Sequence, residues 1–273
     1  MPKRLQSRIL KAKKKEVREI RRGFSEDLLK AAAFSVGGDF RSVEVEIRQS
    51  SPLPLFVELK SILFPEKVHL ENVQPLTIAR LLTRLGVQGG IIVATDTEFL
   101  GGNPSWLNLV KANTEFPLIQ RDFFVDPVQF YQGRAIGADA FLLSDQWGDI
   151  ANLNELAEAA QDTGLEVFLE LSRWELPQAI VAENVTGVIV PLFRNDQGSL
   201  MTGEMKNFLH ALPEKWVRLG RAFPASREEI AALRESGCQG LVLADELWQE
   251  GDIGQAIQRV WGWCLEAATN DQG

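Results

Sequence analysis

Four charged residues close or interrupt apolar segments of this sequence, and their types and positions are the ones best suited to chemistry. Glu58 and Lys60 end one such segment, Arg121 ends a second, and Glu170 lies near the end of a third. Because alternate residues of a β-strand point to the same face, Glu58 and Lys60 share a face. A charge inside an apolar element is costly unless it is paired, so these residues form either an internal salt bridge or a functional site. We favour a functional site.

Glu170 is the residue best suited to acid–base chemistry. Its neighbours are Phe168, Leu169 and Leu171. Apolar surroundings disfavour the ionised form of a carboxyl group and so raise its pKa towards neutrality. The sequence therefore predicts a raised pKa at Glu170 and a role as general base or general acid.

The segments that carry these residues belong to a regular series. Eight short apolar runs rich in β-branched residues are predicted as strands, at residues 55–59, 90–95, 118–123, 140–144, 166–171, 187–192, 217–221 and 240–244. Helical patterns separate or follow them, at residues 73–86, 104–113, 127–136, 152–163, 174–183, 202–212, 226–236 and 253–268. Eight evenly spaced βα units favour an α/β fold closed into a (β/α)8 TIM barrel over an open parallel sheet.

In such a barrel, functional residues lie where the strands end and the following loops begin, which is where the four charged residues fall. No glycine-rich dinucleotide or Walker pattern follows any predicted strand, and this disfavours an open nucleotide-binding sheet. We expect residues 49–273 to form the barrel and residues 1–48 to form an N-terminal helical extension.

The start of the extension is strongly basic. Residues 1–22 hold ten Lys or Arg and two Glu, a local charge of +8 that leaves −16 for residues 23–273 of a chain whose net charge is −8. Leu5, Ile9 and Val17 recur at near-helical spacing. We predict an amphipathic helix that docks its apolar face on the acidic body, in preference to an arm for nucleic acid or for an anionic membrane.

The remaining composition excludes several classes of protein. Two Cys and two His, all far apart in the sequence, disfavour a disulfide framework and a metal centre, so we expect neither a metal nor a cofactor. No apolar run reaches the roughly 18 to 20 residues that cross a bilayer, and the basic start lacks the apolar segment of a secretory signal. We expect a cytoplasmic protein with no membrane partner.

Several motifs resemble those of the indole-3-glycerol-phosphate synthase family, whose members close and decarboxylate a phosphorylated carboxyphenylamino sugar in tryptophan biosynthesis. They extend over nearly the whole chain. In order, they are Arg8-Ile9-Leu10-Lys11, Phe56-Val57-Glu58-Leu59-Lys60, Thr95-Asp96, Phe99-Leu100-Gly101-Gly102, Pro117-Leu118-Ile119-Gln120-Arg121-Asp122-Phe123, Asp126-Pro127-Val128-Gln129, Gly137-Ala138-Asp139-Ala140 and Leu165-Glu166-Val167.

The resemblance implies roles for individual residues. Glu58, Lys60 and Glu170 match catalytic positions of the family, with Glu170 resembling the general base, and Arg121 stands where the family has a catalytic lysine. The candidate substrate-binding residues on the same basis are Phe99, Phe123, Phe193, Arg194 and Arg221.

The sequence departs from the family where the chemistry needs particular groups. A guanidinium with a pKa above about 12 is a poor proton donor near pH 7, so Arg121 could stabilise negative charge but not supply a proton. The family's Glu-Ser-Gly on the seventh strand becomes Arg221-Ala222-Phe223, and its Asn-x-Arg on the sixth becomes Pro191-Leu192-Phe193. A phenylalanine in place of the glycine should block the approach of a phosphate to the backbone.

Apolar residues collect around the predicted mouth, namely Leu63, Phe64, Leu192, Phe193, Phe223 and Trp248. We favour a divergent family member whose ring-closing carboxy-lyase activity is lost or altered. The alternatives are an active synthase that uses Glu170 and Arg121, and a non-catalytic scaffold or regulator that binds a protein through this apolar rim. We also expect a small anionic metabolite at the mouth, because Lys60, Arg121 and Arg221 would outnumber two glutamates there.

Overall fold

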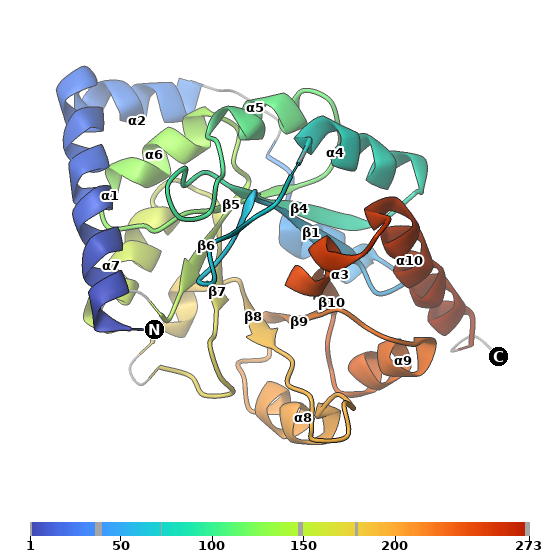
Figure 1. Cartoon of the computed structure of the whole chain (residues 1–273). Coiled ribbons are helices and arrows are strands. Elements are labelled where there is room, and N and C mark those ends of the chain that lie inside the picture. Colours follow the sequence, from blue (N-terminus) through green and yellow to red (C-terminus); the bar gives the residue numbers. More distant parts are fainter. Residues whose placement is uncertain (1, 36–39, 72, 147–149, 178–179, 271–273) are drawn as a thin grey trace.

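The protein is a closed barrel of eight parallel strands surrounded by helices (Figure 1). The computed structural model describes residues 2–35, 40–71, 73–146, 150–177 and 180–270. The barrel strands, in chain order, are β1 (Leu55–Leu59), β4 (Gly89–Ala94), β5 (Leu118–Arg121), β6 (Ala140–Ser144), β7 (Glu166–Glu170), β8 (Gly187–Pro191), β9 (Val217–Ala222) and β10 (Gly240–Leu243). β1 pairs with both β4 and β10, which closes the barrel. The predicted (β/α)8 fold is confirmed, and each predicted strand overlaps a barrel strand.

Helices cover the outside of the barrel, and further helices precede its first strand. The α-helices are α1 (Lys3–Gly23), α2 (Glu26–Ser35), α3 (Val43–Gln49), α4 (Pro75–Arg84), α5 (Ser105–Lys111), α6 (Val128–Ala135), α7 (Ile150–Gln161), α8 (Thr202–His210), α9 (Arg227–Glu235) and α10 (Ile253–Asn270). Two short 3₁₀ helices, η1 (Ala182–Asn184) and η2 (Asp245–Gln249), follow β7 and β10. None of the described helices is both long enough and apolar enough to span a bilayer.

One predicted helix, at residues 174–183, is wrong. Its described residues hold only the start of η1. Pro177 lies in the middle of the segment, and proline disfavours helical backbone at the residue before it and lacks an N–H of its own. The Trp174 indole N–H instead donates to the Pro191 carbonyl oxygen at 2.8 Å, which ties this loop to the end of β8.

A small hairpin that the sequence did not reveal lies in the loop after β1. It pairs β2 (Ile62–Leu63) with β3 (Val68–His69), two strands of two residues each. Ile62 and Leu63 are buried, whereas Val68 and His69 are exposed. Runs this short carry no periodicity that a sequence pattern could show.

The interior of the barrel is apolar at the amino ends of the strands. Side chains of Phe56, Ile92, Ile119 and Phe168 form one buried cluster with Ile47 of α3, which closes the barrel at the amino ends of the strands. Side chains alternate between the inside and the outside of the barrel along each strand, and this determines which residues form the next interior layer. On each strand, the residue two positions after the clustered apolar residue also points into the barrel, and it lies at the carboxyl end of the strand.

The N-terminal extension packs on the barrel, as predicted. α1 runs along one edge of the molecule, and α2 packs against α6 (Figure 1). Ile9 of α1 is buried with Phe99 and Phe123, which follow β4 and β5, while Val17 is buried with Tyr131 of α6. The apolar side of α1 is therefore part of the core.

Candidate functional site

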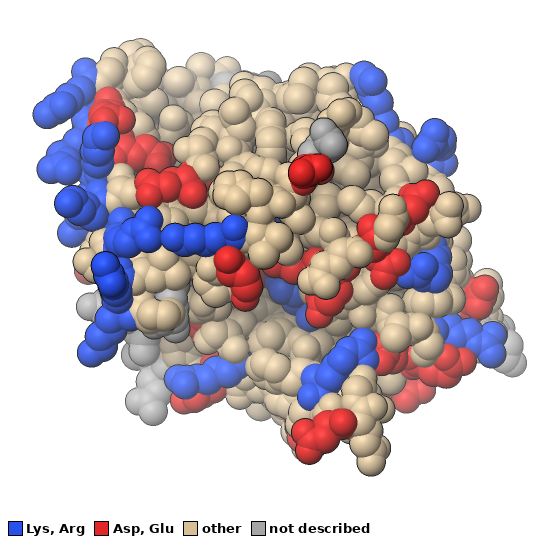
Figure 2. Space-filling view, in the orientation of Figure 1, with Lys and Arg blue, Asp and Glu red and all other residues tan. Residues whose placement is uncertain are grey.

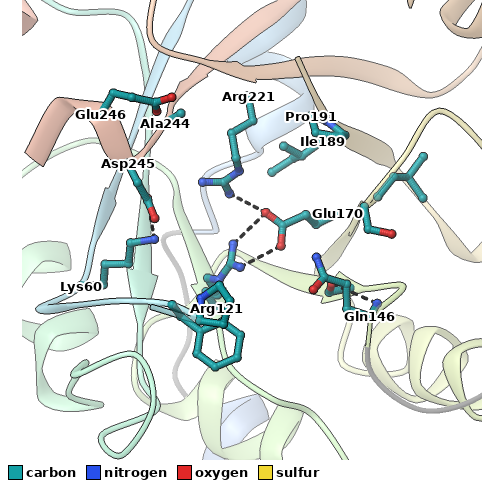
Figure 3. Close-up of a pocket in the computed structure, with 15 residues that line it drawn as sticks. Lys60, Arg121, Gln146, Glu170, Ile189, Pro191, Arg221, Ala244, Asp245 and Glu246 are labelled. Atoms are coloured by element: carbon teal, nitrogen blue, oxygen red, sulfur yellow. Dashed lines mark hydrogen bonds and ion pairs between the residues drawn. The ribbon is translucent and has the colours of Figure 1, made fainter. Parts of the chain in front are cut away.

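A cavity of about 300 Å³ opens at the carboxyl ends of the barrel strands (Figure 3). Its polar lining includes Lys60, Arg121, Glu170, Arg221 and Asp245. The rest of the lining is Phe64, Pro65, Ser144, Gln146, Leu171, Ser172, Ile189, Pro191, Ala244 and Glu246. The structure thus brings the predicted catalytic residues together at the mouth, with Glu58 buried beside them.

Four of these residues form a closed ring of alternating charge, the ion-pair ring of Glu58, Arg121, Glu170 and Arg221. Arg121 contacts Glu170 through two nitrogens, at 2.9 and 2.8 Å, and contacts Glu58 through Nε at 3.2 Å. Arg221 contacts Glu58 at 2.7 Å and Glu170 at 2.8 Å. The four come from β1, β5, β7 and β9, which alternate around the barrel, so the ring is the uppermost layer of its interior.

Lys60 is also paired. Its Nζ lies 2.6 Å from Asp245 Oδ1 and 3.6 Å from Glu58 Oε1. Asp245 follows β10, a position that the sequence prediction of the site omitted. With Asp245 included, the three cations of the mouth have three carboxylate partners, and Glu246 also lines the cavity, so the excess of positive charge that the sequence predicted is absent.

The predicted pKa of Glu170 is wrong in direction. Burial by itself raises the pKa of this carboxyl, but the guanidinium groups of Arg121 and Arg221 favour its ionised form more strongly, and its pKa is lowered. The pKa of Glu58 is lowered for the same reason, since burial is outweighed by Arg121, Lys60 and Arg221. Both carboxylates are therefore held as anions at neutral pH.

This arrangement makes stability depend on pH in acid. A carboxyl whose pKa is lowered by folding stabilises the native state above its unfolded pKa of about 4.3, and that contribution is lost as the pH falls through the folded value. We expect Glu170→Gln to lower the free energy of unfolding at pH 7 and to flatten its decline below about pH 4. Urea unfolding between pH 2.5 and 7 measures both effects. The exposed Glu155→Gln is the control, and equal acid slopes in the two variants would contradict the assignment.

The predicted substrate-binding residues do not all lie at the mouth. Arg221 lies in the ring, but Phe99 and Phe123 are buried under α1, with their rings packed edge to face at 5.8 Å. Phe193 is 41% exposed and lies against Trp174, with ring centroids 5.2 Å apart.

Arg194 is held away from the mouth by its own contacts. It binds both carboxylate oxygens of Glu229, at 2.6 and 3.0 Å, and donates to the Phe223 carbonyl oxygen. Neither Arg194 nor the three phenylalanines line the described cavity.

The rim is less exposed than its composition indicates. Leu63 is buried, Phe64, Leu192, Phe223 and Trp248 are half-buried, and Phe193 alone among the six rim residues is exposed. The replacements have therefore mostly packed into the loops around the mouth.

Sequence reasoning missed Lys13, the most unusual side chain near the site. Lys13 is 1% exposed, and its Nζ lies 2.9 Å from Asp96, 2.6 Å from Asp122 and 2.8 Å from Glu16. Burial lowers the pKa of a lysine, but the three carboxylates outweigh it and the pKa of Lys13 is raised. The signal was present in the sequence, because Lys13 sits four residues from both Ile9 and Val17 on the apolar side of the helix.

The two aspartates that Lys13 joins also shape the loops after β4 and β5. Asp96 accepts hydrogen bonds from the backbone N–H groups of Phe99 and Leu100 at 2.6 and 3.0 Å. Asp122 accepts one from the N–H of Phe123 at 2.7 Å and follows Arg121 of the ring directly. Lys13 therefore connects α1 to the loops beside the mouth.

Among the described residues, no three His, Cys, Asp or Glu side chains are grouped so as to hold a metal ion. The carboxylates of the mouth are instead directed at guanidinium and ammonium groups. The chemistry that these groups can offer is charge stabilisation and hydrogen bonding.

The parallel barrel, its N-terminal helices and the charged cavity at the carboxyl ends of the strands define a (β/α)8-barrel protein with its candidate site at the mouth. The sequence model of the family described as indole-3-glycerol phosphate synthase matches residues 6–260. The chain belongs to that family.

Two relatives in this family show the degree of similarity. Indole-3-glycerol phosphate synthase of Chloroherpeton thalassium is 26% identical over 260 residues, which cover 94% of this chain and 97% of that one. The enzyme of the same name from Shouchella clausii is 26% identical over 221 residues, 80% of this chain and 86% of the other.

Solved structures of several barrel enzymes share the fold of this chain. 3-hexulose-6-phosphate synthase from Salmonella typhimurium matches with a TM-score of 0.58 at 12% identity, over 79% of this chain and all of that one. Orotidine 5'-phosphate decarboxylase from Pyrococcus horikoshii matches with a TM-score of 0.56 at 14% identity, over 77% and 99%. At such identities the likeness is one of fold alone.

Proposed function

We propose that this family member has lost, or greatly reduced, the ring-closing decarboxylation that its family resemblance implies. The observation that carries the proposal is the pairing of Glu170 with two arginines. A general base must accept a proton, and a carboxylate whose pKa is lowered by two guanidinium groups is a weak base. Its oxygens are also occupied, by Arg121 at 2.8 and 2.9 Å and by Arg221 at 2.8 Å.

The position that the resemblance assigns to a catalytic lysine is also a poor proton donor in this chain. Arg121 replaces the lysine, and its contacts with Glu58 and Glu170 raise its pKa even though it is buried. A guanidinium so held does not release a proton near pH 7. Lys60, the remaining amine, is engaged by Asp245 at 2.6 Å.

The phosphate end of the mouth is unfavourable for a phosphate. Asp245 and Glu246 line the cavity there, and Phe223 occupies the place of the family's glycine. Carboxylates close to a phosphate repel it, and a phenylalanine in place of the glycine should hinder the approach of a phosphate to the backbone. Three separate requirements of the reaction are therefore weakened together.

The test compares the purified protein with the Shouchella clausii relative on the phosphorylated carboxyphenylamino sugar, with indole product followed by fluorescence. We expect kcat/KM at least about 10³-fold below that of the relative, because a single lost transition-state interaction already costs about 10²- to 10³-fold. We also expect that the gene does not restore growth of a tryptophan auxotroph. Growth at a normal rate would instead establish an active synthase that uses Glu170 and Arg121.

Reversion distinguishes a remodelled site from a misfolded preparation. The variant R121K/R221E/A222S/F223G restores the family's residues at four positions, and we expect it to gain turnover over the wild type. The single variant R121K is the control, since it leaves Arg221 on Glu170 and should gain little.

The binding of an anionic metabolite at the mouth remains a prediction, and the structure adds a requirement for it. Because each cation has a carboxylate partner, an anion must displace Asp245 from Lys60 in order to bind. Calorimetry with carboxylated and phosphorylated metabolites should therefore show tighter binding to Asp245→Asn than to the wild type. Equal affinities would show that Lys60 is not the anion's partner.

A further inference from the structure

The outward face of α1 carries a row of unpaired cations. Arg4, Lys11, Lys14, Arg18 and Arg22 are exposed, and we call these five residues the basic stripe. Within the part of the chain that the structure describes, none of them forms an ion pair. At 1.5 Å per helical residue, the stripe is about 27 Å long. Figure 2 shows Lys and Arg side chains along the edge of the molecule that α1 forms in Figure 1.

Two cations beside the stripe, Arg21 and Arg8, lie close to carboxylates. Arg21 lies 2.7 Å from Asp126 and 2.9 Å from Glu26, and Arg8 lies 3.9 Å from Glu98. Beyond these pairs the body of the protein is acidic, with −16 over residues 23–273 once the +8 of residues 1–22 is taken from the net −8. The basic stripe is therefore a band of positive charge along α1, with carboxylates beside it.

The width of this band limits what can bind to it. A nucleic-acid duplex or a bilayer surface is wider than one helix, so its anionic groups would also face the carboxylates that flank the stripe. A single polypeptide segment, about 10 Å across when helical, matches the width of one helix.

Two exposed apolar side chains accompany the cations. Leu10 is 43% exposed and lies four residues before Lys14, and Phe24 is 53% exposed just beyond Arg22. The phosphates of a nucleic acid offer nothing to such side chains, whereas a protein segment can bury them and gain about 25 cal/mol for each Å² covered. Charge and apolar contact together favour a protein ligand.

We propose that the basic stripe binds an acidic segment of another protein, in which carboxylates repeat along one face and apolar side chains meet Leu10 and Phe24. This surface is separate from the barrel mouth. Its role does not depend on whether the synthase reaction is retained.

The test uses the full-length protein and fluorescence anisotropy of a labelled 21-residue peptide that repeats Glu-Glu-Leu. We expect binding that weakens at least tenfold between 50 and 200 mM salt, because the contacts are exposed charges. The variant K11E/K14E/R18E should weaken binding at least 20-fold. The matched control R84E/K206E/K215E changes the same number of exposed cations elsewhere and should leave affinity within twofold.

A second variant and two further probes decide the nature of the partner. Leu10→Ser should weaken binding of the Glu-Glu-Leu peptide but not of a Glu-Glu-Ser peptide. The proposal is overturned if neither peptide binds, or if a 20-base-pair DNA duplex or phosphatidylserine vesicles bind more tightly than the peptide. It is also overturned if sedimentation shows that the stripe holds a second copy of this chain, because K11E/K14E/R18E would then abolish a dimer.

Discussion

Replacing Lys13 with methionine should lower the free energy of unfolding by about 3–5 kcal/mol, the cost of removing one partner from a buried ion pair. Methionine fills the space of the lysine stem, so the loss is one of charge rather than of packing. Asp96 and Asp122 would stay buried without a cation, since no other lysine or arginine contacts either of them among the described residues. Thermal and urea unfolding measure the effect.

Lys14 provides the matched control for this experiment. It is the next residue of the same helix but is exposed, so Lys14→Met should change stability by less than about 0.5 kcal/mol. Deleting residues 1–22 should also lower the melting temperature, because it removes Lys13 together with Ile9 and Val17. Equal stabilities for the two methionine variants would show that the Lys13 contacts contribute nothing net.

Most of the barrel could be predicted from the sequence because its strands are buried on both faces. The near-continuous apolar runs alternate with amphipathic helices, and eight evenly spaced units of this kind favour a closed barrel over an open sheet. The failure at residues 174–183 is local. Apolar spacing there resembles a helix, but Pro177 prevents one, and the Trp174 side chain is held by the end of β8.

The sequence pointed to the four charged residues of the ring but not to their electrostatics, and Phe99, Phe123, Phe193 and Arg194 do not line the cavity. The alternation of strand residues places Glu58, Arg121, Glu170 and Arg221 in one inward layer. The pKa of Glu170 depends on which groups lie opposite it across the barrel, and the local sequence shows only Phe168, Leu169 and Leu171. Contacts between residues far apart in the chain reversed the expected direction of the shift.

Arg221→Met should likewise lower the free energy of unfolding by about 3–5 kcal/mol. The change removes one of the two arginines of the ring and leaves Glu58 and Glu170 each with fewer cations than the wild type gives them. Urea unfolding at pH 7 measures the loss. The double variant E170M/R221M removes one charge of each sign, so the remaining Glu58 and Arg121 stay paired.

If the ring is a single structural unit, the double variant should be more stable than the sum of the two single changes by at least about 2 kcal/mol, since contacting charges couple strongly. Functional sites tend to keep unbalanced or strained groups at a cost in stability, whereas a balanced layer lowers that cost. The resemblance implies that the family has a glutamate where this chain has Arg221. The arginine therefore gives the ion-pair ring equal numbers of positive and negative groups. Additive single effects would mean that Arg221 and Glu170 act independently, and the layer would then be better explained as a site that still awaits its ligand.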